Sequence, residues 1–257
     1  MYKLLLFLTF STFLSTVLLA QVTPNPAPIE SGTIRYLVSH NWAKKIEAIS
    51  YLSKQRKERT AYMSGNRDEW FEYALLHFNP MQTKYEDSEE RVKPNEDGYS
   101  WRKETFFTKR DFAQNTLFDG LVVQGKTYLV QDSLHCQDWK ILNDMKEVAG
   151  HLCMNASWED SIKQQKMVAW FALDIPLSGG PERLCGLPGL ILEVDVNNGA
   201  MIISANRIEA KVLTNELDLP KKLKGKKVTE AEYRVALKKC IDDHIKQEQP
   251  YFWDLRY

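Results

Sequence analysis

Short runs in which apolar or β-branched residues alternate with polar ones recur along this chain, and they predict β-strands. Residues 33–38 form one such run, residues 70–78 are aromatic and apolar, and residues 192–196 alternate strictly. Alternation places every second side chain on the same face of a strand, so one face can be buried while the other meets water. The pattern therefore predicts a sheet as the main framework.

Polar pairs that contain glycine join neighbouring strand runs and predict β-hairpins. Asn-Gly at residues 198–199 is the strongest short signal of this kind, because both residues tolerate the positive φ angles of a type I′ turn. With these two residues in the loop, Val196 would face Met201 and the apolar side chains would meet on one face. Gln-Gly at residues 124–125 predicts a second hairpin.

Two stretches carry helical rather than strand spacing. In residues 41–59, apolar residues recur every three positions, and residues 229–247 place Tyr233, Leu237 and Ile241 at helical intervals. Thr229 and Glu232 form a candidate capping box at the start of the second stretch. We therefore predict an α+β fold, with a mainly antiparallel, curved sheet of several hairpins and helices near the N- and C-terminal ends.

The first residues of the chain predict export. Lys3 is followed by an apolar run that ends at Ala20, a pattern typical of a cleaved signal peptide and too short for a confident membrane span. We expect a signal peptide at 1–20, an extended proline-containing leader at 21–31 and a single domain at 32–257, with no integral membrane span after cleavage. The expected location is the periplasm or the exterior.

The charge balance excludes one class of partner. The chain has 34 basic and 34 acidic residues. Without Lys3, 33 basic residues face 34 acidic ones, so the mature chain would carry a net charge of −1. Binding to nucleic acid depends on a basic excess that neutralises phosphates, so we expect no nucleic-acid partner.

A glycine-containing motif precedes the strand at 192–196, and it consists of Gly186, Leu187, Pro188, Gly189, Leu190 and Ile191. Proline presets the φ angle at the second position of a type II turn, and glycine accepts the positive φ at the third. We therefore expect Pro188 and Gly189 to reverse the chain and Leu190 to enter a strand. A role of the glycine amides in binding an anion is the alternative, but glycine turns before buried strands are common.

This motif, with several segments around it, closely resembles the GLPGLI family of Bacteroidetes envelope proteins, first noted in Porphyromonas. The matching segments are Trp139-Lys140-Ile141, Gly150-His151-Leu152-Cys153, Ala169-Trp170-Phe171 and Leu192-Glu193-Val194. The resemblance implies an exported, strand-rich envelope protein without an agreed biochemical activity. Genes of such relatives tend to lie near genes of outer-membrane transport proteins. The resemblance therefore also implies an outer-membrane transport protein as a partner.

The four cysteines, Cys136, Cys153, Cys185 and Cys240, are disulfide candidates because an exported chain meets an oxidising compartment. The polar residues 143–146 predict another hairpin turn, and its register would set Cys136 opposite Cys153. This register favours a Cys136–Cys153 bond, which leaves Cys185 for Cys240. A bond between Cys153 and Cys185 is the rival pairing.

The same hairpin offers an alternative to a disulfide. His135, Cys136, His151 and Cys153 would converge across it, and thiolates with imidazoles suit Cu(I) or Zn. The close cysteine pairs typical of zinc sites are absent from the sequence. A disulfide accounts for the same residues more simply, so we expect no metal and no other cofactor.

Known catalytic motifs are also absent from the sequence. It contains no nucleophile elbow, no zinc-protease helix motif, no phosphate loop and no dinucleotide fingerprint. Glu193 and Asp195 share one face of a strand, a spacing that could serve acid–base chemistry, but outward polar residues are normal in strands. We expect a noncatalytic binding or accessory protein for an apolar, lipid-like ligand or an outer-membrane transport partner. A hydrolase with an unrecognised site is the alternative, and a Cys/His metal protein the third.

Overall fold

The computed structural model describes residues 29–63, 69–92 and 106–257. The expected signal peptide at 1–20 and most of the leader at 21–31 lie outside these residues. The described chain forms one sheet of twelve strands in the order β12-β6-β5-β4-β3-β2-β1-β11-β10-β9-β8-β7. The strands are β1 Gly32–Asn41, β2 Glu69–Phe78, β3 Gln82–Asp87, β4 Phe107–Asp111, β5 Thr116–Val123, β6 Lys126–Ser133, β7 Lys140–Val148, β8 His151–Asp160, β9 Gln165–Ala172, β10 Leu190–Val196, β11 Met201–Ala210 and β12 Lys226–Val228.

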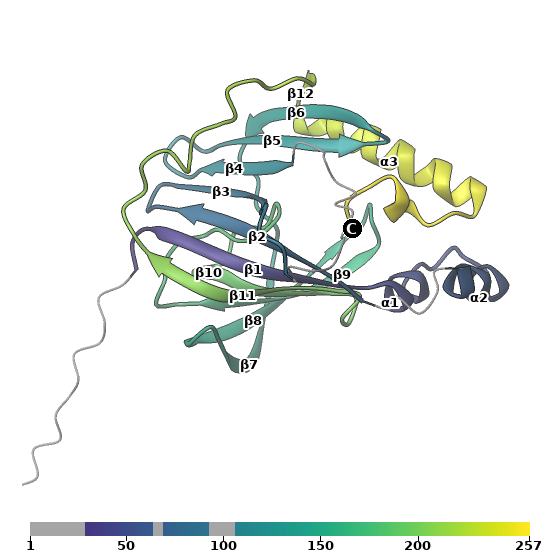
Figure 1. The fold of residues 1–257 in the computed structure, drawn as a ribbon, viewed down its shortest axis with the longest axis horizontal. Helices are drawn as coiled ribbons and strands as arrows, with labels where there is room; N and C mark the ends of the chain where they lie inside the picture. The colour runs from purple at the N-terminus through teal and green to yellow at the C-terminus, as the bar shows by residue number, and fades with distance from the viewer. Residues whose placement is uncertain (1–28, 64–68, 93–105) are drawn as a thin grey trace, which may run out of the picture.

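The sheet is largely antiparallel and curved. Only the short β12 runs parallel to its neighbour, β6, among the described strands. Figure 1 shows the sheet bending around the C-terminal end of the chain. A β-bridge between Val123 and Leu255 and a hydrogen bond from Asn197 Nδ2 to Tyr257 Oη, at 2.8 Å, hold that end on the concave side.

The helices form a minor part of the fold, so the predicted α+β class is wrong. The described residues form a single open sheet. The helices at its margins are α1 Trp42–Glu47, α2 Lys54–Met63 and α3 Glu230–Gln247, with the 3₁₀ helix η1 Tyr251–Trp253. The long helix expected at 41–59 is two helices. Ser53 Oγ accepts the backbone N–H of Arg56 at 3.3 Å, and this capping contact starts α2 anew.

The core lies against the concave face. Along β1, buried and partly exposed residues alternate, and Ile34, Tyr36 and Val38 are fully buried on one side. The Tyr36 hydroxyl donates to the carbonyl oxygen of Ile191 at 2.6 Å, across the fold to β10. The concave face is therefore the hydrophobic side of the sheet, and it is covered by other parts of the same chain.

Two predicted hairpins are confirmed and one is wrong. Residues 198–199 turn with positive φ angles, and Val196 pairs with Met201 as expected. Residues 124–125 also turn with positive φ angles, between β5 and β6. The turn expected at 143–146 lies instead at residues 149–150, where φ is 50° and 86°. Residues 143–146 belong to β7, which is irregular between its pairings at 141 and 145.

The last helix begins as the sequence predicts. The Thr229 side chain accepts the backbone N–H of Glu232, and the Glu232 carboxylate accepts the backbone N–H of Thr229 at 2.8 Å. This capping box satisfies two amides that a helix start would otherwise leave unpaired. Within the described part of the chain, no helix combines the length and apolar character needed to cross a membrane.

Candidate functional site

The segment that carries the glycine motif lies on the concave face. Residues 173–189 connect β9 to β10, and Ile175, Leu177, Leu184 and Leu187 within them are buried. The Leu190 amide donates to the Ile175 carbonyl oxygen at 3.0 Å, which closes the segment on itself. We call residues 173–189 the motif segment. Its buried side chains fill part of the concave side of the sheet.

The two glycines of the motif are required for different reasons. Gly186 has a φ of 101°, in the left-handed region that favours glycine. Gly189 does not have a positive φ, so the type II turn predicted at Pro188 and Gly189 is wrong. A Cβ at Gly189 would lie 2.1 Å from the carbonyl oxygen of Ala172, so this position needs glycine for close approach to β9. Leu190 enters β10 as predicted.

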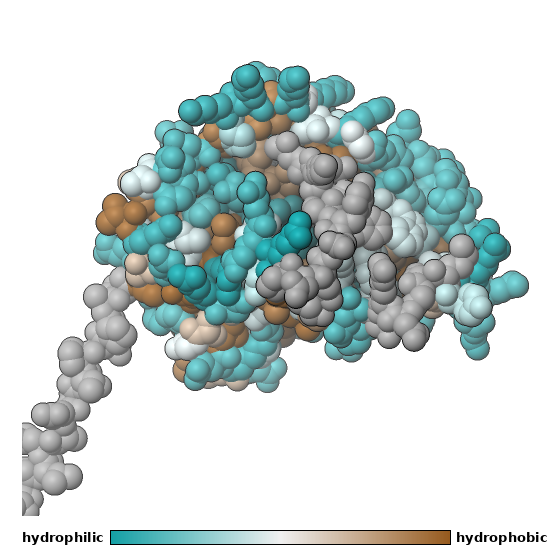
Figure 2. Space-filling view, viewed as in Figure 1, coloured by the Kyte–Doolittle hydropathy of each residue, from teal (hydrophilic) through white to brown (hydrophobic). Residues whose placement is uncertain are grey.

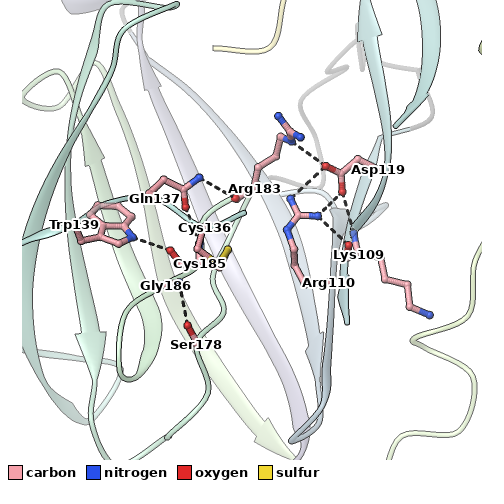
Figure 3. Close-up of a disulfide and its surroundings, with 10 residues drawn as sticks. All are labelled: Lys109, Arg110, Asp119, Cys136, Gln137, Trp139, Ser178, Arg183, Cys185 and Gly186. Carbon is pink, nitrogen blue, oxygen red and sulfur yellow. Dashed lines mark hydrogen bonds and ion pairs between the residues drawn. A yellow bond between two sulfur atoms is a disulfide. The ribbon is translucent and has the colours of Figure 1, made fainter. Parts of the chain in front are cut away.

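A disulfide joins the motif segment to the residues before β7. Cys136 and Cys185 are bonded, and their Cα atoms lie 5.0 Å apart (Figure 3). Cys153 and Cys240 are free and buried. Both predicted pairings are therefore wrong. The shifted hairpin turn is the reason, because it places Cys153 opposite Lys146.

Hydrogen bonds flank this disulfide on both sides. The indole N–H of Trp139 donates to the Cys185 carbonyl oxygen at 2.7 Å, and the Cys185 amide donates to Gln137 Oε1 at 2.9 Å. The Gly186 amide donates to Ser178 Oγ at 3.0 Å. These contacts converge on the bond in Figure 3. The strand-connecting residues 134–139 and the motif segment therefore form one cross-linked unit.

A buried carboxylate fixes the motif segment to the sheet. Asp119 of β5 is fully buried and pairs with Arg110 at 2.5 Å and with Arg183 at 2.8 Å (Figure 3). Arg183 belongs to the motif segment and also pairs with Glu230, at the start of α3. Burial raises the pKa of Asp119, but the charges of Arg110 and Arg183 lower it more, so its pKa lies below the ordinary value. The network therefore favours the ionised form of Asp119.

Glu182, which precedes Arg183 in the motif segment, is an acidic residue paired with a basic one. Glu182 accepts from Arg256 Nε at 2.7 Å, and Arg256 also pairs with Asp87 of β3 at 2.7 Å. Glu182 has a φ of 57°, which is uncommon for a residue with a side chain. Glu182 and Arg183 are thus adjacent residues of opposite charge, and each pairs with a residue of the opposite sign. Their ion pairs connect the motif segment to the sheet, to α3 and to the C-terminal end.

The residues of the alternative metal site are not brought together. Cys136 is bonded to Cys185, and His151 Nδ1 lies 2.7 Å from the Asp174 carboxylate. Burial raises the pKa of the Cys153 thiol to about 11, which disfavours the thiolate that metals bind. The described residues contain no group of three or more metal-binding side chains in a suitable arrangement.

The paired acids considered for catalysis have partners of their own. Glu193 forms an ion pair with Lys146 and accepts from Ser204 Oγ at 2.8 Å. Asp195 Oδ1 accepts the Gly199 amide at 2.5 Å, within the hairpin turn. These contacts tie β10 to β7 and β11 and support the sheet. Both carboxylates are therefore engaged in contacts within the sheet.

Exposed apolar side chains gather near the end of the described sheet, on β7, on β8 and directly after β9. Ile141, Met145, Leu152 and Leu173 are 48, 57, 60 and 51 % exposed, respectively. We call these four residues the edge patch. Apolar residues are visible in Figure 2 at the lower border of the molecule, where Figure 1 places β7 and β8.

The strand register places the edge patch on one side of the sheet, beside the motif segment. Ile141 pairs with residue 156 and Met145 with residue 154, so both lie on the face that Leu152 shares. Leu173 follows the residue paired with Cys153, so it lies beside Leu152. A Cβ at Gly189 would be 3.2 Å from the Leu173 amide nitrogen.

Sequence reasoning missed the charged network and the edge patch. A signal for the network was present, since Asp119 is the only charged residue in the apolar run at 117–123. A lone carboxylate in a buried strand needs a paired charge. The edge patch had no such signal, because it depends on which strand ends the sheet.

Comparisons with known proteins support a family of unknown function over part of the chain and a strand-rich fold. Residues 155–193 match a family model described as a protein of unknown function (Porph_ging). The match includes the glycine motif, and it supports the family resemblance over that stretch. No curated protein matches the sequence.

Among solved structures, the chain is similar to PNGF-II in space group P2₁, with a TM-score of 0.53 and 14 % identity over 81 % of this chain and 33 % of that one. The C2 crystal form of PNGF-II gives a TM-score of 0.50 and 13 % identity over 80 % of this chain and 32 % of that one. The chain thus spans about a third of the length of PNGF-II. At this level of identity the likeness shows the fold alone.

Proposed function

We propose that this chain is an exported, noncatalytic protein of the cell envelope that binds a protein partner through the edge patch. The observation that carries the proposal is the cluster of four apolar side chains, each about half exposed, near the β7 end of the described sheet. Contiguous exposed apolar residues commonly mark interaction surfaces. A terminal strand also offers unpaired backbone groups to an incoming strand.

Export is supported by two independent features of the chain. The charged start, the apolar run and Ala20 match a secretory signal. The bond between Cys136 and Cys185 belongs to an oxidising compartment, because thiols are kept reduced in the cytosol. The periplasm or the exterior is the proposed location.

The packing of the concave face favours a protein partner over a lipid-like ligand. The motif segment and the C-terminal end occupy that face, and ion pairs from Arg183 and Arg256 hold them. A carrier needs apolar space that a ligand can enter, whereas here the apolar side of the sheet is covered by the chain's own residues. Glu193 and Asp195 are engaged in structural contacts, which supports a role without catalysis.

We propose an outer-membrane transport protein as the partner, with an extended segment of it lying along β7. Backbone pairing with β7 would supply affinity, and Ile141 and Met145 on β7 would contact alternate side chains of the added strand. The disulfide-bonded unit beside the edge patch is already held in place by covalent and hydrogen bonds. Binding there would cost less conformational entropy, because a rigid surface loses less freedom on association.

Site-specific photo-cross-linking in cells tests this proposal. A photoreactive residue would replace Met145 or Leu152, with Val235 on α3, which is 70 % exposed, as the matched control. We expect one discrete adduct with an outer-membrane transport protein from positions 145 and 152 and none from 235. The absence of an adduct, or equal adducts from all three positions, would refute the edge-patch site. Native mass spectrometry of the purified protein distinguishes partner binding from a lipid-carrier role. Extra mass that leaves on unfolding would favour a lipid carrier.

A further inference from the structure

A depression on the convex face of the sheet has the chemistry of a binding site. It has a volume of about 400 Å³ and lies over β3 to β6. Its lining consists of Gln82, Lys109, Asp111, Gln114, Thr116, Leu117, Phe118, Gln131 and Leu219. Ligand sites commonly have volumes of about 300–1,000 Å³, so this depression is large enough for a small molecule.

The strand register arranges its polar residues in rows. Gln82 pairs with Asp111, and Asp111 pairs with Thr116 on the next strand. Lys109 pairs with Phe118, and Phe118 pairs with Gln131. Paired residues point to the same face of a sheet, so two adjacent rows line the floor of the depression. Neither row includes a residue of the disulfide-bonded unit or of the edge patch.

Hydrogen bonds fix part of this lining in advance. Gln82 Nε2 donates to Asp111 Oδ2 at 2.6 Å, and the backbone N–H of Gln114 donates to Asp111 Oδ1 at 2.8 Å. Lys109 Nζ donates to the Leu217 carbonyl oxygen at 2.8 Å, and Lys84 Nζ holds the neighbouring Glu216 carbonyl oxygen at 3.1 Å. The two lysines thereby secure the connection from β11 to β12, which supplies Leu219 as a wall. A lining that is already ordered binds with a smaller entropy loss.

The charge of the lining selects the class of ligand. Lys109 and Asp111 carry opposite charges, so the site has no net charge. An anionic ligand would call for a cluster of basic side chains, and a lipid chain would call for a mainly apolar lining. Three glutamine amides, a hydroxyl and a carboxylate match a neutral molecule rich in hydroxyl groups.

We propose that this depression binds a neutral carbohydrate of one or two pyranose rings. Each glutamine side-chain amide can donate to one hydroxyl and accept from another. Each Asp111 oxygen already accepts one hydrogen bond and keeps a second lone pair that can accept a hydroxyl. The Phe118 ring is partly exposed on the floor. Its electron-rich face suits the weakly positive C–H bonds of a sugar ring. The inference is independent of the proposed partner binding at the edge patch.

Saturation-transfer NMR with neutral disaccharides tests the site. Maltose, cellobiose and lactose serve as free disaccharide ligands, and dextran serves as a polysaccharide. Comparing them shows whether the site binds a free sugar or a sugar unit within a polysaccharide. The test variants are Gln131→Ala, which removes an exposed amide, and Phe118→Leu, which removes the ring. Gln247→Ala on α3 removes an exposed amide elsewhere and is the matched control.

We expect saturation transfer to at least one of these probes at millimolar concentration. Gln131→Ala should weaken its binding by about two- to tenfold, the effect of one hydrogen bond, and Phe118→Leu should weaken it as well. The control should bind like the wild type. No transfer to any of the four probes, or equal transfer in all variants, would overturn the proposal. Binding of glucose 6-phosphate in place of the neutral sugars would do so too, because it would show a site for anions.

Discussion

Loss of the Cys136–Cys185 bond should destabilise the fold by a predictable amount. The two residues are separated by 49 positions along the chain. In the chain-entropy model, a cross-link that closes a loop of this size removes about 4 kcal/mol of freedom from the unfolded chain. Single domains have a free energy of unfolding of about 5–15 kcal/mol. The disulfide therefore accounts for a large share of this free energy.

Urea unfolding of the double variant Cys136→Ser, Cys185→Ala measures this share. We expect its free energy of unfolding to be lower than that of the oxidised wild type by about 4 kcal/mol. Wild type reduced with dithiothreitol should lose a similar amount, and this second measurement separates the lost bond from any effect of the new side chains. Both samples should remain folded without urea if the margin is in the upper part of the usual range.

Thiol mapping tests the connectivity itself. Alkylation after denaturation without reductant should label Cys153 and Cys240 and leave the other two cysteines unlabelled. A stability loss below about 1 kcal/mol in both samples would refute the entropic reasoning. Labelling of Cys136 or Cys185 in the oxidised protein would refute the pairing.

Three further predictions follow from local geometry. Gly189→Ala should destabilise the fold by about 3 kcal/mol or more, because its Cβ would overlap a carbonyl oxygen; Gly150→Ala, which has open space but a φ of 86°, should cost only about 1–2 kcal/mol in the same thermal or urea unfolding assay. Arg183→Met should cost about 2 kcal/mol at neutral pH, because it removes a partner from the buried Asp119. The folded-state pKa of Asp119 lies below its unfolded value, so its contribution is present above the unfolded pKa and lost as the pH falls through the folded pKa; unfolding series at decreasing pH should show a weaker loss in Arg183→Met than in the wild type. Cys153 should react slowly with iodoacetamide at neutral pH in the folded protein and rapidly in urea, since burial raises its pKa to about 11; fast labelling of the folded protein would contradict this.

Features set by neighbouring residues could be predicted from the sequence. The turn at 198–199 forms because asparagine and glycine both accept positive φ angles there, and its register follows from the turn alone. The capping box at Thr229 is likewise decided by residues three positions apart. Such features carry their cause within a few residues.

The hairpin turn predicted at 143–146 is an example in which local composition predicted the wrong position. Asn143 and Asp144 have the composition of a turn, but Asp144 forms side-chain and backbone hydrogen bonds with Asn155 across β7 and β8. The chain turns at residues 149–150, where a lone alanine and glycine gave a weaker signal. One misplaced turn then changed the partner of Cys153 and, with it, the predicted disulfide pairing. Fold class failed for a related reason, since spacing identifies helices but not their share of the structure.

The glycine motif is best understood as the signature of how this sheet covers its own concave face. Leu187, Leu190 and Ile191 are buried anchors, while Gly186 and Gly189 meet a φ requirement and a space requirement. None of these five residues offers a reactive group. The residues that sequence similarity marks most clearly therefore specify a structural closure. A function for this chain has to be sought on the surfaces that the closure leaves outside, which are the edge of β7 and the convex face over β3 to β6.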